Sequence, residues 1–211
     1  MRLLHVDASA RYEGSTSREL SAFFVAQLRL RLATFDVDYL DLAQDPPPHV
    51  SAIQTAAHYT APQDHTREMR ESIRRSDLLV DQLLASHACV FAMPMYNYAA
   101  PSTFKAYIDN VVRTGRTFES TPSGIRGLLA DRPLLFITSR GGDYAQGGSM
   151  AGQDLLVPWL QQLFCFLGAS EMTFVSAQPM QFAGPEAKIA GLEAARHQLA
   201  DIATRWGARL S

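Results

Sequence analysis

Residues 88–101 read ACVFAMPMYNYAAP, an apolar run that ends at one proline and a short aromatic turn that ends at another. We interpret residues 88–93 as a β-strand, because a short apolar run stopped by Pro94 suits a buried strand. Pro101 suits the first turn of the helix that follows. A strand without polar alternation is typical of a parallel sheet that is covered on both faces. The stretch therefore predicts one strand, one turn and one helix of an α/β protein.

The same succession of short apolar runs and helical periods occurs on both sides of this stretch. Further strands are predicted at residues 3–6, 37–42, 134–138 and 172–176, and helices at residues 20–32, 69–84, 101–113, 155–167 and 189–206. The predicted fold is α/β, a doubly wound, five-stranded parallel sheet with helices on both faces. The common strand order for such a sheet is 2-1-3-4-5, the flavodoxin-like order. We expect one domain over residues 1–211, with an irregular excursion at residues 43–65 around three consecutive prolines.

The composition argues against several classes of partner. The 211 residues carry 19 Lys and Arg against 21 Asp and Glu, a formal net charge of −2, without the basic stripe of a nucleic-acid-binding protein. No apolar stretch is long enough to cross a membrane. Cys89 and Cys165 lie in apolar strings and are expected to be buried free thiols, which fits a reducing compartment such as the cytoplasm. The six histidines lack metal-ligand spacing, so no metal site is predicted.

The loop after the first strand is rich in groups that bind phosphate. In a sheet of this order, ligands bind at the carboxyl ends of the strands, where the first and third strands diverge. The loop supplies Ser9, Arg11, Ser15, Thr16 and Ser17. Hydroxyl groups, a cation and the free N–H groups of a helix start all favour an anion. The alternative is ordinary capping, in which Thr16 and the glutamate three residues later form a capping box. The glycine patterns of dinucleotide and triphosphate sites are absent, so a ligand of mononucleotide size is expected.

The loops after the third and fourth strands complete the predicted site. The third-strand loop holds Pro94, Met95, Tyr96, Asn97 and Tyr98. Large flat side chains on a rigid turn suit a planar aromatic ring, and the alternative is that they only cover the edge of the sheet. The fourth-strand loop holds Ser139, Arg140, Gly141, Gly142 and Tyr144. Adjacent glycines let the backbone approach a ligand closely, and the alternative is a mobile connector.

Taken in order along the chain, these motifs resemble those of the FMN-dependent NADH:quinone oxidoreductase and azoreductase family, which has a flavodoxin-like fold. The matching pieces are Ser9 with Ser15-x-Ser17, Met95-Tyr96-Asn97-Tyr98 with Pro101, residues 114–118, Ser139-Arg140-Gly141-Gly142, and residues 154–159. Tyr98 stands where phenylalanine is usual in that family, and residues 43–65 diverge.

The resemblance implies a cofactor and a reaction. Ser9 and residues 15–17 would hold the phosphate of FMN, residues 95–98 would pack along its isoalloxazine ring, and residues 139–142 would donate to the polar edge of that ring. NADH or NADPH would give a hydride to the flavin and leave, and a quinone or azo compound would then take both electrons from the same face, a ping-pong sequence. The cofactor carries the chemistry, so no catalytic side chain is predicted.

The resemblance also implies how substrate and partner reach the site. Phe118 and Tyr144 are candidates for lining the substrate pocket, and the alternative is that they are aromatic residues of the core or the rim. The family works as homodimers with the site near the interface, so the excursion at residues 43–65 would reach the flavin of a partner. The partners expected are thus a small quinone or azo acceptor and a second copy, with no nucleic acid and no membrane.

Two other functions remain as alternatives. A serine hydrolase would use Ser149, since residues 147–151 approximate a nucleophile motif, but Ser149 lies ten residues beyond Ser139, whereas such a nucleophile follows a strand directly. An electron-transfer protein with the same fold and no broad reductase activity would usually be strongly acidic, to steer charged partners, and a net charge of −2 argues against it.

Overall fold

A five-stranded parallel sheet forms the centre of the molecule. The computed structural model describes residues 1–129 and 132–210. The strands are β1 (Arg2–Asp7), β2 (Asp36–Asp41), β3 (Ala88–Pro94), β6 (Leu134–Ser139) and β7 (Met172–Ala177). They lie in the order β2-β1-β3-β6-β7, and every neighbouring pair is parallel. Counted along the sheet this is 2-1-3-4-5, so the predicted order is confirmed.

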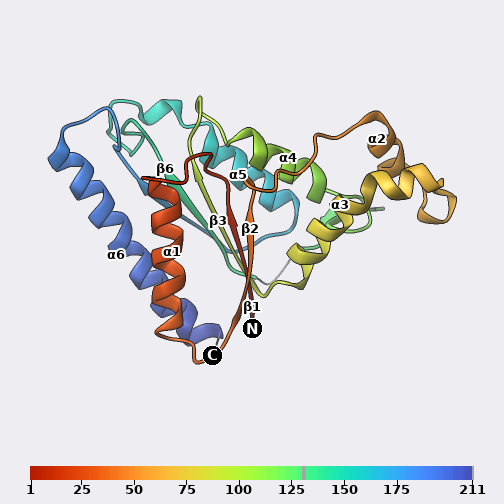
Figure 1. The fold of residues 1–211 in the computed structure, drawn as a ribbon, viewed down its shortest axis with the longest axis horizontal. Helices are drawn as coiled ribbons and strands as arrows, with labels where there is room; N and C mark the ends of the chain where they lie inside the picture. Colours follow the sequence, from red (N-terminus) through yellow and green to blue (C-terminus); the bar gives the residue numbers. More distant parts are fainter. Residues whose placement is uncertain (130–131, 211) are drawn as a thin grey trace.

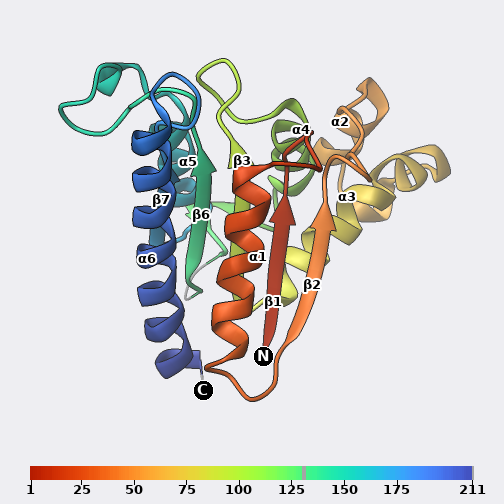
Figure 2. The same ribbon diagram turned by 60° about the vertical axis from the view of Figure 1, so that its left-hand side comes forward.

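Helices cover both faces of the sheet, as predicted (Figures 1 and 2). One face carries α1 (Thr16–Arg29) and α6 (Pro185–Leu210), and the other carries α3 (Arg67–Ala85), α4 (Ser102–Val111) and α5 (Leu156–Phe166). No helix in the described part of the chain is both long and apolar enough to cross a membrane.

Two separate apolar cores result because neighbouring residues of a strand point to opposite faces. Val90 packs in the core under α1 and α6, whereas Phe91 packs in the core under the other three helices, and both are fully buried. Phe91 contacts the rings of Phe104, Phe136 and Phe164, with centroids 5.3–5.8 Å apart. The all-apolar run that predicted a covered strand thus has a direct cause, since both of its faces are buried.

A two-stranded hairpin, β4 (Phe118–Thr121) with β5 (Gly124–Gly127), lies outside the prediction. It contacts the end of α5 very closely, because a Cβ atom on Gly127 would lie 2.0 Å from the carbonyl carbon of Leu167. The backbone N–H of Leu129 donates to the carbonyl of Leu167 at 2.8 Å, which ties the hairpin to that helix.

The excursion at residues 43–65 is not irregular throughout, and that part of the prediction is wrong. It contains α2 (Ala52–Tyr59) and a short 3₁₀ helix, η1 (Pro62–Asp64). Buried Asn110 on α4 holds this segment: its Nδ2 donates to the carbonyl of Pro48 at 2.8 Å, and its Oδ1 accepts from Gln54 Nε2 at 2.8 Å. The polar side chains meet in the interior, which explains why the hydrophobic pattern did not reveal α2.

Two further expectations about single residues are wrong. Cys89 is buried, but Cys165 is exposed. Although its neighbours in the sequence are apolar, Cys165 lies on the side of α5 that faces away from the sheet. The helical period of residues 189–206 predicts that Ile189 is buried, but Ile189 is 56% exposed, whereas Leu199, Ile202 and Trp206 further along the same helix are buried. The last helix therefore meets the core mainly through its second half.

Asn110→Ala tests the polar contact that holds the excursion. The change leaves the Gln54 amide and the Pro48 carbonyl without their partner, and unsatisfied buried polar groups cost about 1–3 kcal/mol each. We expect the free energy of unfolding to fall by about 2 kcal/mol or more, and amide hydrogen exchange to accelerate most at residues 48–57. Gln161→Ala, at an exposed position on α5, is the control and should change neither quantity. Uniform acceleration throughout the chain would contradict the local role of Asn110.

Candidate functional site

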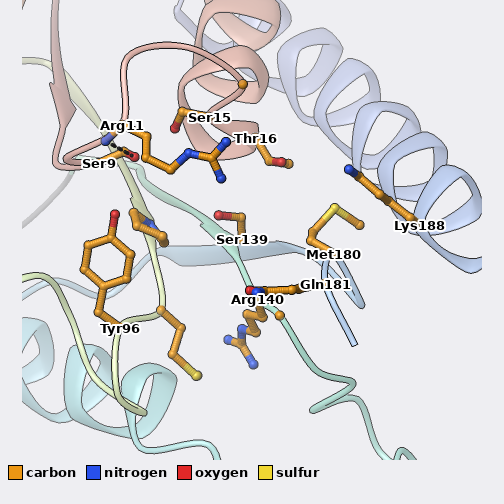
Figure 3. Close-up of a pocket in the computed structure, with 14 residues that line it drawn as sticks. Ser9, Arg11, Ser15, Thr16, Tyr96, Ser139, Arg140, Met180, Gln181 and Lys188 are labelled. Carbon is orange, nitrogen blue, oxygen red and sulfur yellow. Dashed lines mark hydrogen bonds between the residues drawn. The ribbon is translucent and has the colours of Figure 1, made fainter. Parts of the chain in front are cut away.

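A cleft of about 430 Å³ lies at the carboxyl ends of β1, β3 and β6 (Figure 3). Its lining comes from four connections that are far apart in the sequence and from α6. The lining residues are Ser9, Arg11, Gly14, Ser15, Thr16, Pro94, Met95, Tyr96, Ser139, Arg140, Gly141, Met180, Gln181 and Lys188. The structure therefore brings the three predicted loops together at the point where strand order reverses.

The first wall of the cleft is the loop between β1 and α1. Ser15 is the N-cap residue of α1, but its side chain makes no capping hydrogen bond, and Thr16 already belongs to the helix. The capping box suggested by Thr16 is therefore not formed. Ser9 Oγ accepts from the backbone N–H of Arg11 at 3.2 Å. Hydroxyl groups and the first N–H groups of α1 are thus free to meet an anion.

Ser17, also predicted in this loop, lies deeper than the others. It is fully buried and does not line the cleft, and its Oγ lies 3.5 Å from Ser15 Oγ. Its hydroxyl therefore contacts the loop from within the protein.

The side chain of Arg18, on α1, holds the backbone of this loop in place. Its guanidinium donates to the carbonyl of Ser9 at 2.7 Å (Nη2) and 3.3 Å (Nε), and it also pairs with the carboxylate of Asp41 at 2.7 Å. Bidentate contacts of this kind hold a backbone group in one orientation. No local pattern in the sequence indicates this role, because Asp41 lies at the end of a different strand.

The second wall is a tight turn made by residues 96–99. Tyr96 and Ala99 exchange two backbone hydrogen bonds of 3.0 Å, and the residues between them, Asn97 and Tyr98, have φ of 50° and 68°. A left-handed conformation is common for asparagine but costs a bulky residue such as tyrosine about 1–2 kcal/mol. The strained turn leaves Tyr96 and Tyr98 partly exposed beside the cleft. Met95 joins this turn to the next loop, since its N–H donates to the carbonyl of Ser139 at 2.8 Å.

The third wall is the loop after β6, which is held by the side chain of Arg140. Arg140 is 3% exposed, and its Nη1 donates to Asp154 Oδ2 at 2.8 Å. Asp154 Oδ1 accepts in turn from the first N–H groups of α5. The Arg140 side chain is therefore committed to a structural ion pair, so the backbone of this loop is the part left for a ligand.

A side chain at either glycine of this loop would have to displace a neighbouring side chain. A Cβ atom on Gly141 would lie 3.0 Å from the ring of Phe182, and one on Gly142 would lie 2.4 Å from Met150 Sδ. Neither glycine N–H donates to a backbone carbonyl or side chain in the described part of the protein. Gly141 lines the cleft, so its N–H is a free donor at a place where a ligand can approach closely, whereas Gly142 is buried and does not line the cleft.

A second cavity of about 380 Å³ continues from the first and is mainly aromatic at its edge. The two share Met95, Tyr96, Gly141 and Gln181. The second adds Asn97, Tyr98, Tyr144, Met150 and Phe182. The rings of Tyr98 and Tyr144 meet edge to face, 6.5 Å apart. Burial raises the pKa of Tyr144 above its usual value, so its hydroxyl stays protonated at neutral pH.

The charge of the lining suits an anion at the first cavity. Among the described residues, Arg11, Arg140 and Lys188 are the cations that line it and no carboxylate does, but Arg140 is already paired with Asp154. Arg11 and Lys188 form no ion pair with the described residues, and Figure 3 shows Lys188 extending from α6 toward Thr16. Phosphate therefore fits this end of the site, and a flat ring fits the aromatic end.

Most predicted site residues line these two cavities, but Ser17, Gly142 and Phe118 do not. Phe118 also lies apart from the predicted loops. It packs against Phe166 at a centroid distance of 4.9 Å and lines neither cavity. Met180, Gln181, Phe182 and Lys188 were missed. All four follow β7, so the rule that ligands meet the carboxyl ends of strands would have found their loop had it been applied to the fifth strand as well.

Ser149, the residue required by the hydrolase alternative, is exposed in a turn beyond β6. It forms no hydrogen bond with a histidine among the described residues. A nucleophilic serine needs a base within hydrogen-bonding reach. The structure therefore gives the hydrolase alternative no support.

The comparisons with known proteins agree with this geometry. A family model described as a flavodoxin-like fold matches residues 1–203. A protein of Nostoc punctiforme named FMN-dependent NADH:quinone oxidoreductase is 39% identical over 206 residues, which cover 98% of this chain and all of that one. A protein of the same name from Azotobacter vinelandii is 36% identical over 203 residues, 96% of this chain and 99% of that one.

A solved structure shows the same likeness in three dimensions. The crystal structure of an azoreductase from Bacillus anthracis superimposes with a TM-score of 0.89 at 27% identity, covering 97% of this chain and 99% of that one. With nearly the whole chain matched in sequence and in fold, this protein belongs to the flavodoxin-like family of FMN-dependent NADH:quinone oxidoreductases.

Proposed function

We propose that this protein binds FMN in the two joined cavities and uses it to reduce quinones and azo compounds with electrons from NADH. One observation carries the proposal. A cavity lined by hydroxyl groups, cations and a helix start continues directly into a cavity edged by tyrosines. FMN has the same division, with a phosphate at one end and a flat ring at the other.

The residues present fit this cofactor in their chemistry. Ser9, Arg11, Ser15 and Thr16 would hold the phosphate, and Ser17 would support them from within the loop. Pro94, Met95, Tyr96, Asn97 and Tyr98 would pack along the ring. The free N–H groups of Gly141 and Gly142, with Ser139 and the backbone of Arg140, would donate to the polar edge of the ring, and Tyr144 would close its outer side.

FMN, when bound, supplies the redox chemistry by accepting a hydride from NADH and passing two electrons to the acceptor. The protein contributes position and electrostatics. Fixed N–H donors aimed at the polar edge of the ring stabilise negative charge there without any acidic side chain. The Tyr144 hydroxyl, which stays protonated, adds another donor at the rim.

We expect NADH and the acceptor to enter through the same opening of the aromatic cavity, so that the two must bind one after the other. Tyr98, Tyr144 and Phe182 edge that opening, and Phe182 is 72% exposed. NADH and the acceptor would both stack on this rim, so one must leave before the other enters. This is a ping-pong order, and it favours small, flat, mostly uncharged acceptors.

The assembly and location that we propose rest on exposed groups. A homodimer would cover aromatic residues such as Tyr59, which is 86% exposed on α2, and would bring the segment 43–65 toward the site of the partner. Cys89 and Cys165 are both unpaired, which suits the reducing cytoplasm.

The proposed reaction is tested by mixing the FMN-loaded protein with NADH in the absence of oxygen. The flavin absorbance should bleach within the dead time or within seconds, and addition of a quinone should restore it. Replacing the quinone by buffer is the control, in which the bleached state persists. A protein that holds FMN but is not bleached by NADH would be an electron carrier, and one that holds no FMN would contradict the whole proposal.

Ser15→Ala tests the phosphate end of the site separately. Ser15 lines the cleft and makes no capping bond, so its loss should not weaken α1. Hydrogen bonds to charged groups contribute about 1.5–3 kcal/mol, so FMN should bind about 10-fold to 100-fold more weakly. Riboflavin, which has no phosphate, should bind as it does to the unchanged protein.

The comparison uses fluorescence titration of both ligands, with Ser102→Ala, an exposed serine on α4, as the matched control. Equal losses of FMN and riboflavin affinity in Ser15→Ala would remove the phosphate-binding role from this loop.

A further inference from the structure

A third cavity, of about 470 Å³, lies away from the flavin site, between α2, η1, α3 and the loop after α4. It shares no lining residue with the two cavities of the candidate site. Its lining residues are Ala57, His58, Thr60, Pro62, His65, Arg70, Ile73, Asp77, Arg113, Thr114, Gly115 and Arg116. Its volume falls within the range of small-molecule sites, about 300–1,000 Å³.

Arg113 is the central feature of this cavity, because its charge is buried and only partly paired. The residue is 7% exposed. Its side chain donates to Ser76 Oγ at 2.5 Å and to Asp77 Oδ1 at 3.3 Å, in both cases through Nη1. Nε and Nη2 form no hydrogen bond with the described residues. A buried guanidinium with unused donors is costly unless an acceptor satisfies them.

The surrounding charges leave a positive surplus. Three guanidinium groups, those of Arg70, Arg113 and Arg116, line the cavity, against the single carboxylate of Asp77. Asp77 is already shared, at 3.3 Å from Arg113 and 3.5 Å from Arg116. Arg116 also pairs with Asp81, which lies outside the lining. Burial lowers the pKa of Arg113, the neighbouring Arg116 lowers it further, and together they outweigh the contacts with Asp77, which raise it.

The excess of positive charge also affects His58, which lies on α2. Its pKa is lowered to about 4, first by burial and then by Arg113, with a smaller contribution from His65. His58 Nε2 is enclosed and has no hydrogen-bond partner. His65 Nε2 lies 2.9 Å from the carbonyl of Ala57 and is occupied there. His58 is therefore neutral at physiological pH and adds no charge of its own to the cavity.

We propose that this cavity is a second anion site, which binds the phosphate group of a small molecule or free phosphate. A guanidinium fork presents parallel N–H donors that match two oxygens of such an anion, and Arg113 has an unused pair of nitrogens for this contact. Asp77 in the lining and Asp81 beside it offset two of the three guanidinium charges, so one positive charge remains for a bound anion to offset. The Thr114 side chain is at hand in the lining for a third oxygen.

An occupant would also connect two parts of the chain. It would contact α2 and η1 on one side and residues 113–116 on the other, and so brace the excursion against the end of α4. This inference does not depend on the proposed redox function.

Sulfate is the probe, because it stays doubly charged over the whole pH range in which His58 titrates. The ring signals of His58 and His65 are followed by NMR in the full chain, with FMN bound and again without it, while sodium sulfate replaces sodium chloride at constant ionic strength. A bound dianion offsets Arg113, so the pKa of His58 should rise by about 1. The histidine signals report this cavity alone, so the result does not depend on whether FMN binds.

Variants make the assignment specific. Arg116→Gln, at the half-exposed rim, should weaken sulfate binding about 5-fold or more, and Arg113→Lys should weaken it as well, because lysine keeps the charge but lacks the fork. Arg67→Gln is the matched control, since Arg67 is an exposed arginine of α3 that pairs with Glu71 outside the cavity. Histidine signals that respond equally to sulfate and chloride would overturn the proposal, as would equal affinities in Arg116→Gln and Arg67→Gln.

Inorganic phosphate and glycerol phosphate then distinguish the source of the anion. Tighter binding of glycerol phosphate identifies the phosphate group of a small organic molecule as the ligand, and equal or tighter binding of inorganic phosphate identifies the free anion. Failure of both to bind at millimolar concentration would contradict the site.

Discussion

The parallel pairing of β1 with β3 is the constraint on which the site depends. Asp7 lies opposite Ala92, and the ladder continues one residue further, where the N–H of Ala8 donates to the carbonyl of Ala92 at 2.9 Å. Immediately afterwards the two chains part: β1 leads to α1 on one face, and β3 leads to α4 on the other (Figure 2). Two paired strands whose connections diverge must leave a crevice between them, and the phosphate loop and the tyrosine turn form its two sides.

Within that crevice, some residues adopt unfavourable backbone conformations or leave backbone N–H groups unpaired, and both features favour the binding of a ligand. Tyr98 takes a left-handed conformation that a glycine would adopt more easily, and Gly141 and Gly142 keep free N–H groups instead of pairing them. Such departures persist only where the surroundings fix them. Here Arg18, which lies outside the cleft, holds the loop after β1, and the Arg140–Asp154 ion pair holds the loop after β6. The third cavity has the same character, because buried Arg113 has donors that the chain itself does not use.

The strands and most of the site could be predicted because they depend on local patterns. Buried parallel strands need continuous apolar runs, and phosphate loops and ligand turns follow those strands directly.

The hairpin at residues 118–127 escaped prediction because its strands are short and largely exposed, so they carry no apolar run. The helix α2 escaped because it is held by the polar contacts of Asn110 from a distant helix. The roles of Arg140 and Arg18 depend on partners elsewhere in the chain, Asp154 and Asp41, which no spacing rule identifies. Phe118, a candidate for the substrate pocket by resemblance, packs against Phe166 and lines neither cavity of the site.

The central claim is that one cleft at the β1–β3 divergence holds a phosphate at its serine end and a flat ring at its tyrosine end. A crystal structure of the protein with FMN measures this directly. We predict that the phosphate oxygens accept hydrogen bonds from the hydroxyl groups of Ser9 and Ser15 and from the first N–H groups of α1, and that the ring lies beside Tyr96 and Tyr98. FMN bound in the opposite orientation, or in another cavity of the molecule, would contradict it.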